Sequence, residues 1–135
     1  GGGLLAGTSL LAKSINPNIK VYGAEPKNAD DTYRSIKNKK IVPNKTTETI
    51  ADGLRAQVGT ITFPIIQKNV DGIILVSEEM IIQSMRTIWQ RMKIIIEPSC
   101  SIALAAILIN NEQFHNKRIG IILTGGNVDL DSLPW

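Results

Sequence analysis

The chain has 135 residues, of which 43% are apolar and 20% are charged, and this composition is typical of one globular domain with its own core. The 15 basic and 12 acidic residues give a formal charge of +3, too weak and too evenly spread to indicate a nucleic-acid partner. The single cysteine, Cys100, excludes an internal disulfide and a multi-cysteine zinc site, and it fits a reducing, cytoplasmic compartment. The longest apolar run, residues 102–109, is far shorter than the roughly 20 residues of a membrane span. We therefore expect neither a nucleic acid nor a membrane as a partner.

The chain begins directly on Gly1-Gly2-Gly3, without an initiator methionine, and passes at once into a helical pattern. Apolar residues recur at helical spacing from 4 to 15, and Asn16-Pro17 ends that helix. We expect a chain that opens in this way to be a piece of a longer one. Its apolar residues would then include surface that packs against other segments, so the isolated piece should be less stable and less soluble than its composition suggests.

Helical and strand patterns alternate along the rest of the chain. The clearest helical repeat is Ile81, Met85, Ile88 and Met92, and it follows a good N-cap at Ser77. The expected strands cover residues 21–24, 72–76 and 118–123, and the expected helices cover residues 4–15, 30–37, 63–70, 78–93 and 101–110. Strands separated by helices predict an α/β fold, with a mainly parallel sheet and flanking helices, within one domain over residues 1–135.

Three unusual segments lie where ligands bind in parallel α/β sheets, beyond the carboxyl ends of the strands or at the start of a helix. The first is the run Gly1-Gly2-Gly3-Leu4, which leads straight into a helix. Free amide groups at a helix start can bind a phosphate, and glycines let the ligand come close; the alternative is a flexible end or a tight turn. The run is neither a dinucleotide fingerprint nor a P-loop.

The second segment follows the first strand and reads Glu25-Pro26-Lys27-Asn28-Ala29-Asp30-Asp31. Three carboxylates around one turn can bind a hard cation such as Mg²⁺ or Ca²⁺, with backbone carbonyl groups as further ligands. Acidic residues are also ordinary at the start of a helix, so the pattern leaves both interpretations open.

The third segment, Leu123-Thr124-Gly125-Gly126-Asn127, follows the last expected strand. Its hydroxyl group and two glycines can face a flat ligand, and the alternative is a plain β-turn. Two other kinds of site are disfavoured. The one histidine, His115, lies in a polar connection, so a catalytic triad is hard to build, and Cys100 is expected to be a buried structural thiol.

Five segments together resemble one enzyme family: GGGLLAG, VYGAEPKNADD, TIADGLR, RMKIIIEPS and LTGGNVDLDSLPW, in this order and at these spacings. They are similar to the C-terminal part of the large domain in fold-type II (tryptophan synthase β-like) pyridoxal phosphate (PLP) enzymes. Within that group they resemble the branch that holds the serine racemases and the threonine dehydratases. The resemblance covers the chain from Gly1 to Trp135, and the second and last segments are its most specific parts.

The resemblance implies roles at a PLP site. Thr124 matches a hydroxyl residue beside the pyridine nitrogen, where a hydroxyl instead of a carboxylate leaves that nitrogen largely unprotonated. Gly53 and Glu97 match positions that line the cofactor pocket. The loop that cradles the phosphate of PLP is matched by Gly1, Gly2, Gly3 and Leu4.

The resemblance also implies two further ligands. Glu25, the carbonyl of Ala29 and Asp31 match a structural, activating site for Mg²⁺ (or Ca²⁺ or Mn²⁺). Lys93 and Asn127 match residues that contact ATP, an activator, at the subunit interface of a homodimer.

The activity implied for the complete protein is removal of the α-proton of serine, with threonine as a second substrate. Reprotonation on the other face racemises serine, and loss of the β-hydroxyl gives pyruvate and ammonia. The family's Schiff-base lysine lies N-terminal to the part that this chain resembles, so we expect residues 1–135 alone to hold no catalytic residue, to bind PLP poorly and to be inactive. Two alternatives are a catabolic L-threonine/L-serine dehydratase and a non-catalytic remnant that binds a partner subunit or a divalent cation.

Overall fold

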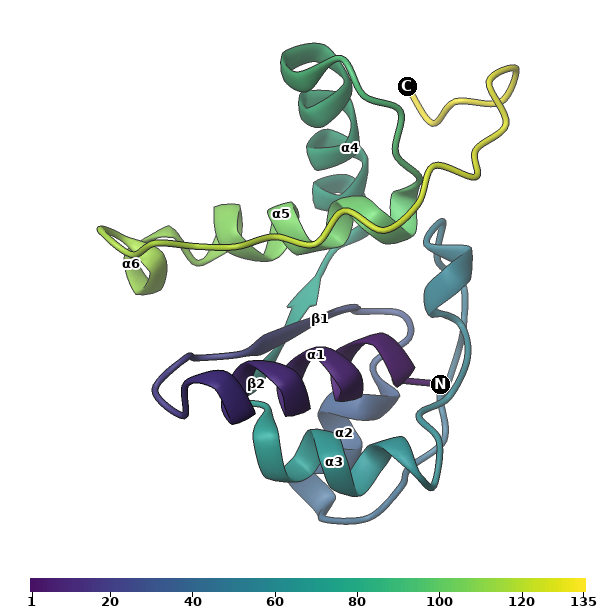
Figure 1. Ribbon diagram of the computed structural model, residues 1–135. Coiled ribbons are helices and arrows are strands. Elements are labelled where there is room, and N and C mark those ends of the chain that lie inside the picture. Colours follow the sequence, from purple (N-terminus) through teal and green to yellow (C-terminus); the bar gives the residue numbers. More distant parts are fainter.

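The computed structural model describes residues 1–135, and its helices and strands alternate as the sequence predicts (Figure 1). All the predicted helices and the first two predicted strands are confirmed, with ends that differ by a few residues. None of the helices combines the length and the apolar character that crossing a bilayer requires. The elements are α1 (Gly3–Ile15), β1 (Tyr22–Pro26), α2 (Asp31–Asn38), the 3-10 turn η1 (Asp52–Leu54), α3 (Thr62–Asn69), β2 (Gly72–Val76), α4 (Glu78–Met92), α5 (Pro98–Ile109) and α6 (Asn111–Phe114).

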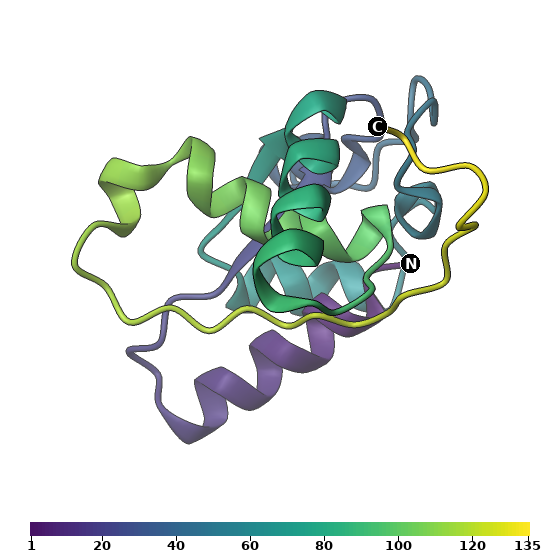
Figure 2. The same ribbon diagram turned by 90° about the horizontal axis from the view of Figure 1, so that it is seen from above.

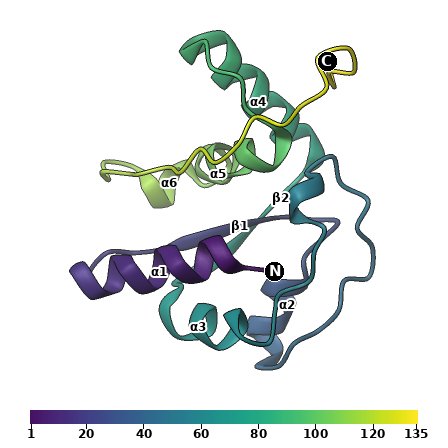
Figure 3. The ribbon, with the colours of Figure 1, turned by 45° about the vertical axis from the view of Figure 1, so that its right-hand side comes forward.

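The two strands pair in parallel, with Tyr22 opposite Gly72 and Pro26 opposite Val76. Helices cover both faces of this small sheet: α1, α2 and α3 lie on one side, and α4, α5 and α6 lie on the other (Figures 1 and 3). Because the strands run in the same direction, their carboxyl ends meet at one edge, close to the starts of α2 and α4. The predicted fold class, an α/β fold with flanking helices, is confirmed.

Three apolar clusters hold the layers together. The first packs Val76 and Ile81 against α5, and the second packs Ala6 of α1 against Ile66 of α3. The third joins α4 and α5 to the carboxyl-terminal segment, with Met85, Ile88, Ile96 and Cys100 at its centre and Leu123, Val128 and Leu133 packed around them. The segment that contains the Thr-Gly-Gly sequence is therefore anchored on both of its sides.

Local sequence explains where the two central helices begin. The Ser77 hydroxyl accepts a hydrogen bond from the amide of Met80 at 3.4 Å, which confirms the predicted N-cap of α4. Helix α5 begins at Pro98, three residues before the predicted start. Proline is favoured in the first turn of a helix because it has no amide hydrogen to leave unpaired there.

The third predicted strand, residues 118–123, is wrong. The segment pairs with no strand and makes no backbone hydrogen bond, and Ile119, Ile121 and Ile122 are exposed. In Figures 1 and 2 it is the yellow-green stretch of chain that follows α6. The apolar run predicts an extended backbone, but a strand forms only where a second strand offers matching donors and acceptors. Within residues 1–135 the sheet consists of β1 and β2 alone.

Asp71, just before β2, fastens three segments together. Its carboxylate accepts hydrogen bonds from Lys13 at 2.8 Å, from Lys20 at 2.9 Å and from the amide of Val21 at 2.9 Å. Burial alone would raise the pKa of Asp71, but the hydrogen bonds from both lysines outweigh it and hold the pKa well below its usual range. The end of α1 and the entry into β1 are thereby fixed to the start of β2.

Candidate functional site

The predicted site residues form three groups in space. The glycine run lies at the start of α1, and Gly53, Glu97, Thr124 and Asn127 lie where η1 and the start of α5 meet the segment after residue 123. The start of α1, η1 and the segment after residue 123 lie toward the same end of the molecule (Figures 1 and 2). The acidic residues form the third group, between β1 and α2.

The glycine run rests on the start of α3. Gly2 has a left-handed backbone with a φ of 78°, and a Cβ there would lie 2.8 Å from Ile66 Cδ1, so only glycine fits. The carbonyl of Gly1 accepts a hydrogen bond from the Thr62 hydroxyl at 2.5 Å and another from the Gly59 amide at 3.2 Å. The run is therefore a fixed turn and not a flexible end.

The amide groups at the start of α1 are free to bind a ligand. The N–H groups of Gly3 and Leu4 have no hydrogen-bond partner, and no acidic side chain occupies the first turn of the helix. The first N–H groups of a helix lack intrahelical acceptors and carry the positive end of the helix dipole. This turn therefore fits an anionic group such as a phosphate.

Glu97 holds the segment Thr124–Asn127 through both its backbone and its side chain. Its N–H donates to the carbonyl of Gly125 at 3.0 Å, and its Oε2 accepts from the amide of Asn127 at 2.9 Å. A Cβ on Gly126 would lie only 2.7 Å from the carbonyl oxygen of Ile95. The segment is not the plain β-turn considered from the sequence, because it lies extended along residues 95–97.

Gly53 approaches the same place from η1. Its amide donates to the Ser99 hydroxyl oxygen at 3.0 Å, and a Cβ on Gly53 would lie 3.9 Å from Glu97 Oε1. The Ser99 hydroxyl in turn donates to Asp52 at 3.3 Å. The structure thus brings Gly53 and Glu97 together, as the resemblance implies.

A hydrogen bond to Cys100 holds the backbone of Thr124 in position. The amide of Thr124 donates to Cys100 Sγ at 3.2 Å, and Cys100 is 2% exposed, which confirms the expectation of a buried thiol. Residue Thr124 itself is exposed, so it is accessible to a ligand. Together, the glycine turn and the Thr124 segment provide free amide groups and an exposed hydroxyl residue, and η1 packs closely beside Glu97. These features fit a flat, phosphorylated cofactor such as PLP.

In the acidic group, the carboxylates of Glu25 and Asp31 accept hydrogen bonds from backbone amides. Glu25 accepts from the amides of Thr32 at 3.0 Å and Tyr33 at 2.9 Å, so it caps α2 from the neighbouring strand. Asp31 Oδ2 accepts from the amide of Val58 at 2.7 Å. The strand β1 and the segment at Val58 are thereby attached to the start of α2.

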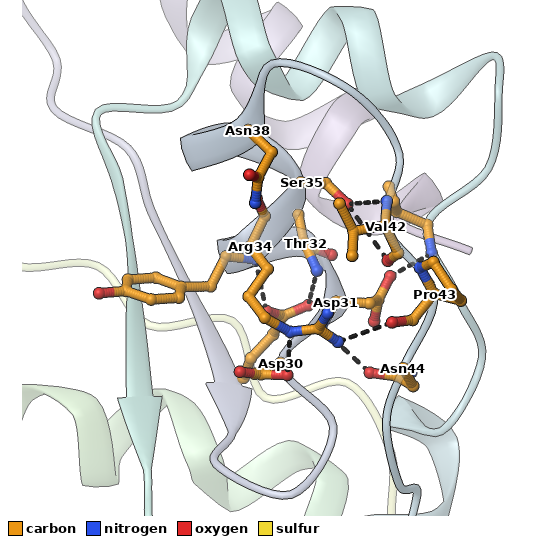
Figure 4. A network of polar contacts seen from close by, with 12 residues as sticks. Asp30, Asp31, Thr32, Arg34, Ser35, Asn38, Val42, Pro43 and Asn44 are labelled. Atoms are coloured by element: carbon orange, nitrogen blue, oxygen red, sulfur yellow. Dashed lines mark hydrogen bonds and ion pairs between the residues drawn. The ribbon is translucent and has the colours of Figure 1, made fainter.

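The third carboxylate of this group has another partner. Asp30 forms an ion pair with Arg34 at 2.7 Å, and the same guanidinium donates to the carbonyl of Pro43 (Figure 4). The side chain of Asn44 accepts a hydrogen bond from the amide of Asp31 at 3.0 Å, which fixes the loop that contains Pro43 and Asn44 to the start of α2. Asp30 is therefore occupied by a basic side chain.

Glu25 and Asp31 have no such partner, because neither forms an ion pair with a lysine or an arginine. Burial raises the pKa of Glu25 to about 7; the amides of Thr32 and Tyr33 oppose this rise, and the charge of Asp31 adds to it. The carbonyl of Ala29, a fully buried residue, accepts no hydrogen bond. Two carboxylates that repel each other and a free carbonyl fit a hard divalent cation, whose remaining ligands would be water, since no cluster of three metal-binding side chains exists.

Lys93 and Asn127 are exposed, and no hydrogen bond joins them. Lys93 ends α4 in a left-handed conformation with a φ of 60°, and its amide donates to the carbonyl of Trp89. Asn127 is held through its backbone to Glu97, which leaves its side chain free of a partner within the protein.

Sequence reasoning missed the residues that support these groups from a distance. The Thr62 hydroxyl donates a hydrogen bond to the carbonyl of Gly1, and the amide of Val58 donates one to the carboxylate of Asp31. The amide of Ile50 donates to Glu78 Oε2 at 2.9 Å, which holds the loop that leads to Gly53. The partners of Thr62 and Val58 lie 61 and 27 residues away along the chain, so no local pattern identifies them.

Comparison with known proteins agrees with this geometry. The family model described as pyridoxal-phosphate dependent enzyme matches residues 1–125. A serine racemase of Dictyostelium discoideum is 56% identical over 98% of this chain, and a beta-hydroxyaspartate dehydratase of Paracoccus denitrificans is 43% identical over all of it. The solved structure of maize serine racemase superposes with a TM-score of 0.92 at 43% identity, over 97% of this chain and 41% of that one.

The chain spans 42% and 43% of the length of the two curated relatives. The match to the family model nevertheless extends over nearly the whole chain. This chain therefore belongs to the family of pyridoxal-phosphate dependent enzymes.

Proposed function

We propose that the complete protein interconverts L- and D-serine with PLP and also converts serine to pyruvate and ammonia. The observation that carries the proposal is that the free amide groups at the start of α1 and the Thr124 segment held by Glu97 lie toward the same end of the molecule, on opposite sides of the sheet (Figure 1). Relatives named serine racemase support the racemisation, and a relative named beta-hydroxyaspartate dehydratase supports the elimination.

The residues of this chain have separate tasks in that proposal. PLP, when bound, supplies an electron sink for the electron pair left when the α-proton departs. The N–H groups of Gly3 and Leu4 bind its phosphate, and the hydroxyl of Thr124 is assigned to the pyridine nitrogen. Glu97 orients the Thr124 segment, and Gly53 allows η1 to approach Ser99 and Glu97 closely. Residues 1–135 thus form part of the large, PLP-binding domain.

Two further ligands belong to the same proposal. Glu25, Ala29 and Asp31 hold Mg²⁺, and Lys93 and Asn127 contact ATP at the interface of a homodimer. The complete protein works in the cytoplasm on serine, with threonine as a second substrate.

The test is a product assay on the full-length protein with PLP and L-serine, with and without Mg²⁺ and ATP. We expect both D-serine and pyruvate, with more of each when Mg²⁺ is present. No D-serine, together with rapid formation of 2-oxobutyrate from threonine, would identify a threonine dehydratase instead. Residues 1–135 alone serve as the control and are expected to form neither product.

The cation site has its own prediction. In the full-length protein, Asp31→Asn should weaken Mg²⁺ binding at least about tenfold, since it removes one of two carboxylates. Asparagine keeps an acceptor for the amide of Val58, so the protein should still fold and bind PLP. Isothermal titration with MgCl₂ measures the change, and Asp30→Asn, which only breaks the pair with Arg34, is the matched control. Equal Mg²⁺ affinity in the two variants would show that Asp31 is only a structural residue at the start of α2.

A further inference from the structure

A short segment, residues 58–62, contacts both the proposed cation site and the glycine run. At one end, the amide of Val58 donates to Asp31 Oδ2 at 2.7 Å, and both residues are buried. At the other end, the amide of Gly59 and the hydroxyl of Thr62 donate to the same carbonyl oxygen, that of Gly1, at 3.2 and 2.5 Å. Because Val58 and Gly59 are consecutive, the two sites are separated by one peptide unit of this segment.

The same segment also forms the surface on which the glycine run packs. A Cβ on Gly2 would lie 3.2 Å from Thr62 Oγ1 and 3.3 Å from Val58 Cγ2. Val58 is 3% exposed and packs with Ala6 of α1 and with α3. Protein interiors are close-packed, so a shift of Val58 cannot be absorbed locally. A shift at Val58 would therefore move Gly2 and the free N–H groups that follow it.

The carboxylate of Asp31 is the point at which a cation would act on this segment. This carboxylate has no basic partner, and the one hydrogen bond that it accepts comes from the amide of Val58. A cation bound to Asp31 and Glu25 would remove the repulsion between the two carboxylates and fix the orientation of the one that holds Val58. An ordered Val58 in turn holds Gly59 and Thr62 in place beneath Gly1.

We propose that Thr62 is a positioning residue for the phosphate-binding amide groups of Gly3 and Leu4, and that residues 58–62 couple Mg²⁺ at Asp31 to binding of the PLP phosphate. The inference rests on the proposed function, since it takes PLP and Mg²⁺ as the two ligands. Coupling between two binding sites is reciprocal, so each ligand must raise the affinity for the other by the same factor.

The coupling is measured on the full-length apoprotein without any activity assay. The Kd for PLP is determined by fluorescence titration with and without saturating MgCl₂, and the Kd for Mg²⁺ is determined by calorimetry with and without PLP. We expect each ligand to tighten the other about tenfold, within the usual range of coupling between sites. Thr62→Val keeps the volume but removes the hydroxyl and should reduce the factor to less than about threefold, while Thr62→Ser should restore it.

Thr87→Val is the matched control, because the Thr87 hydroxyl donates to the carbonyl of Gln83 within α4, away from both sites. It should leave the coupling factor unchanged. Binding of PLP and of Mg²⁺ without mutual effect in the unmodified protein would overturn the coupling alone, and full coupling in Thr62→Val would overturn the role of Thr62. Failure to bind PLP under any condition would contradict the proposed function itself, and the coupling with it.

Discussion

Replacing Gly126 by alanine is expected to lower the affinity of the full-length protein for PLP by about 5- to 150-fold, because forcing a methyl group into a packed contact costs roughly 1–3 kcal/mol. The added Cβ would lie 2.7 Å from the backbone carbonyl oxygen of Ile95. Backbone cannot rotate away as a side chain can, so the Thr124 segment must move away from residues 95–97. This movement would stretch the hydrogen bonds that Glu97 makes to Gly125 and Asn127.

Titration of the apoprotein with PLP, followed by cofactor fluorescence, measures this effect. Gly120→Ala is the matched control: it makes the same chemical change a few residues earlier, where no atom lies within 4 Å of the new Cβ. If both variants bind PLP equally well, the close approach of Gly126 to Ile95 does not position the cofactor site. Circular dichroism of both variants separates a local shift of the segment from a loss of fold.

Replacing Asp71 by asparagine is expected to lower the free energy of unfolding by about 1–2 kcal/mol at pH 7, the usual range for charge-assisted hydrogen bonds that are partly buried. Asparagine has nearly the same shape but carries no charge for Lys13 and Lys20. The side chain of Asp71 is 18% exposed, and Lys13 at 21% contributes more than Lys20 at 67%, whose ion pair is screened by solvent.

The pH dependence of this effect has a definite sign. The pKa of Asp71 is lower in the folded protein than in the unfolded chain, so the carboxylate stabilises the fold at pH values above its usual pKa of about 3.8. As the pH falls below about 4, the unfolded chain takes up the proton first, and the stabilisation decreases progressively until the pH passes below the pKa of the folded carboxyl group. Denaturant unfolding should therefore give a smaller difference between the two proteins at pH 3 than at pH 7.

The exposed Asp131 provides the matched control for Asp71, since its side chain makes no hydrogen bond or ion pair. Asp131→Asn should unfold like the unmodified protein at both pH values. A difference between Asp71→Asn and the unmodified protein that stays the same at pH 3 would mean that packing, and not charge, explains the role of Asp71.

The sequence predicted well those features whose causes lie within a few residues. Helix α4 follows from the repeat of Ile81, Met85 and Ile88 and from the cap at Ser77, and all of these are local signals. The segments before α1 and after β1 and the Thr-Gly-Gly segment were likewise identified from their own composition. The assembly of the first and last of these segments into a single PLP site, by contrast, is implied by the resemblance and is not a consequence of any one pattern.

The sequence by itself determined the order of helices and strands, the caps of the helices and the family of the chain, because periodicity, capping and motif spacing act over a few residues or a fixed register. The tertiary structure alone decided that residues 118–123 pair with no strand, that Glu97 holds the Thr124 segment, and that Thr62 and Val58 join the glycine run to Asp31. Each of these contacts, or the lack of one, depends on which donors and acceptors the folded chain brings together from distant positions, and hydrophobic periodicity carries no information about that choice.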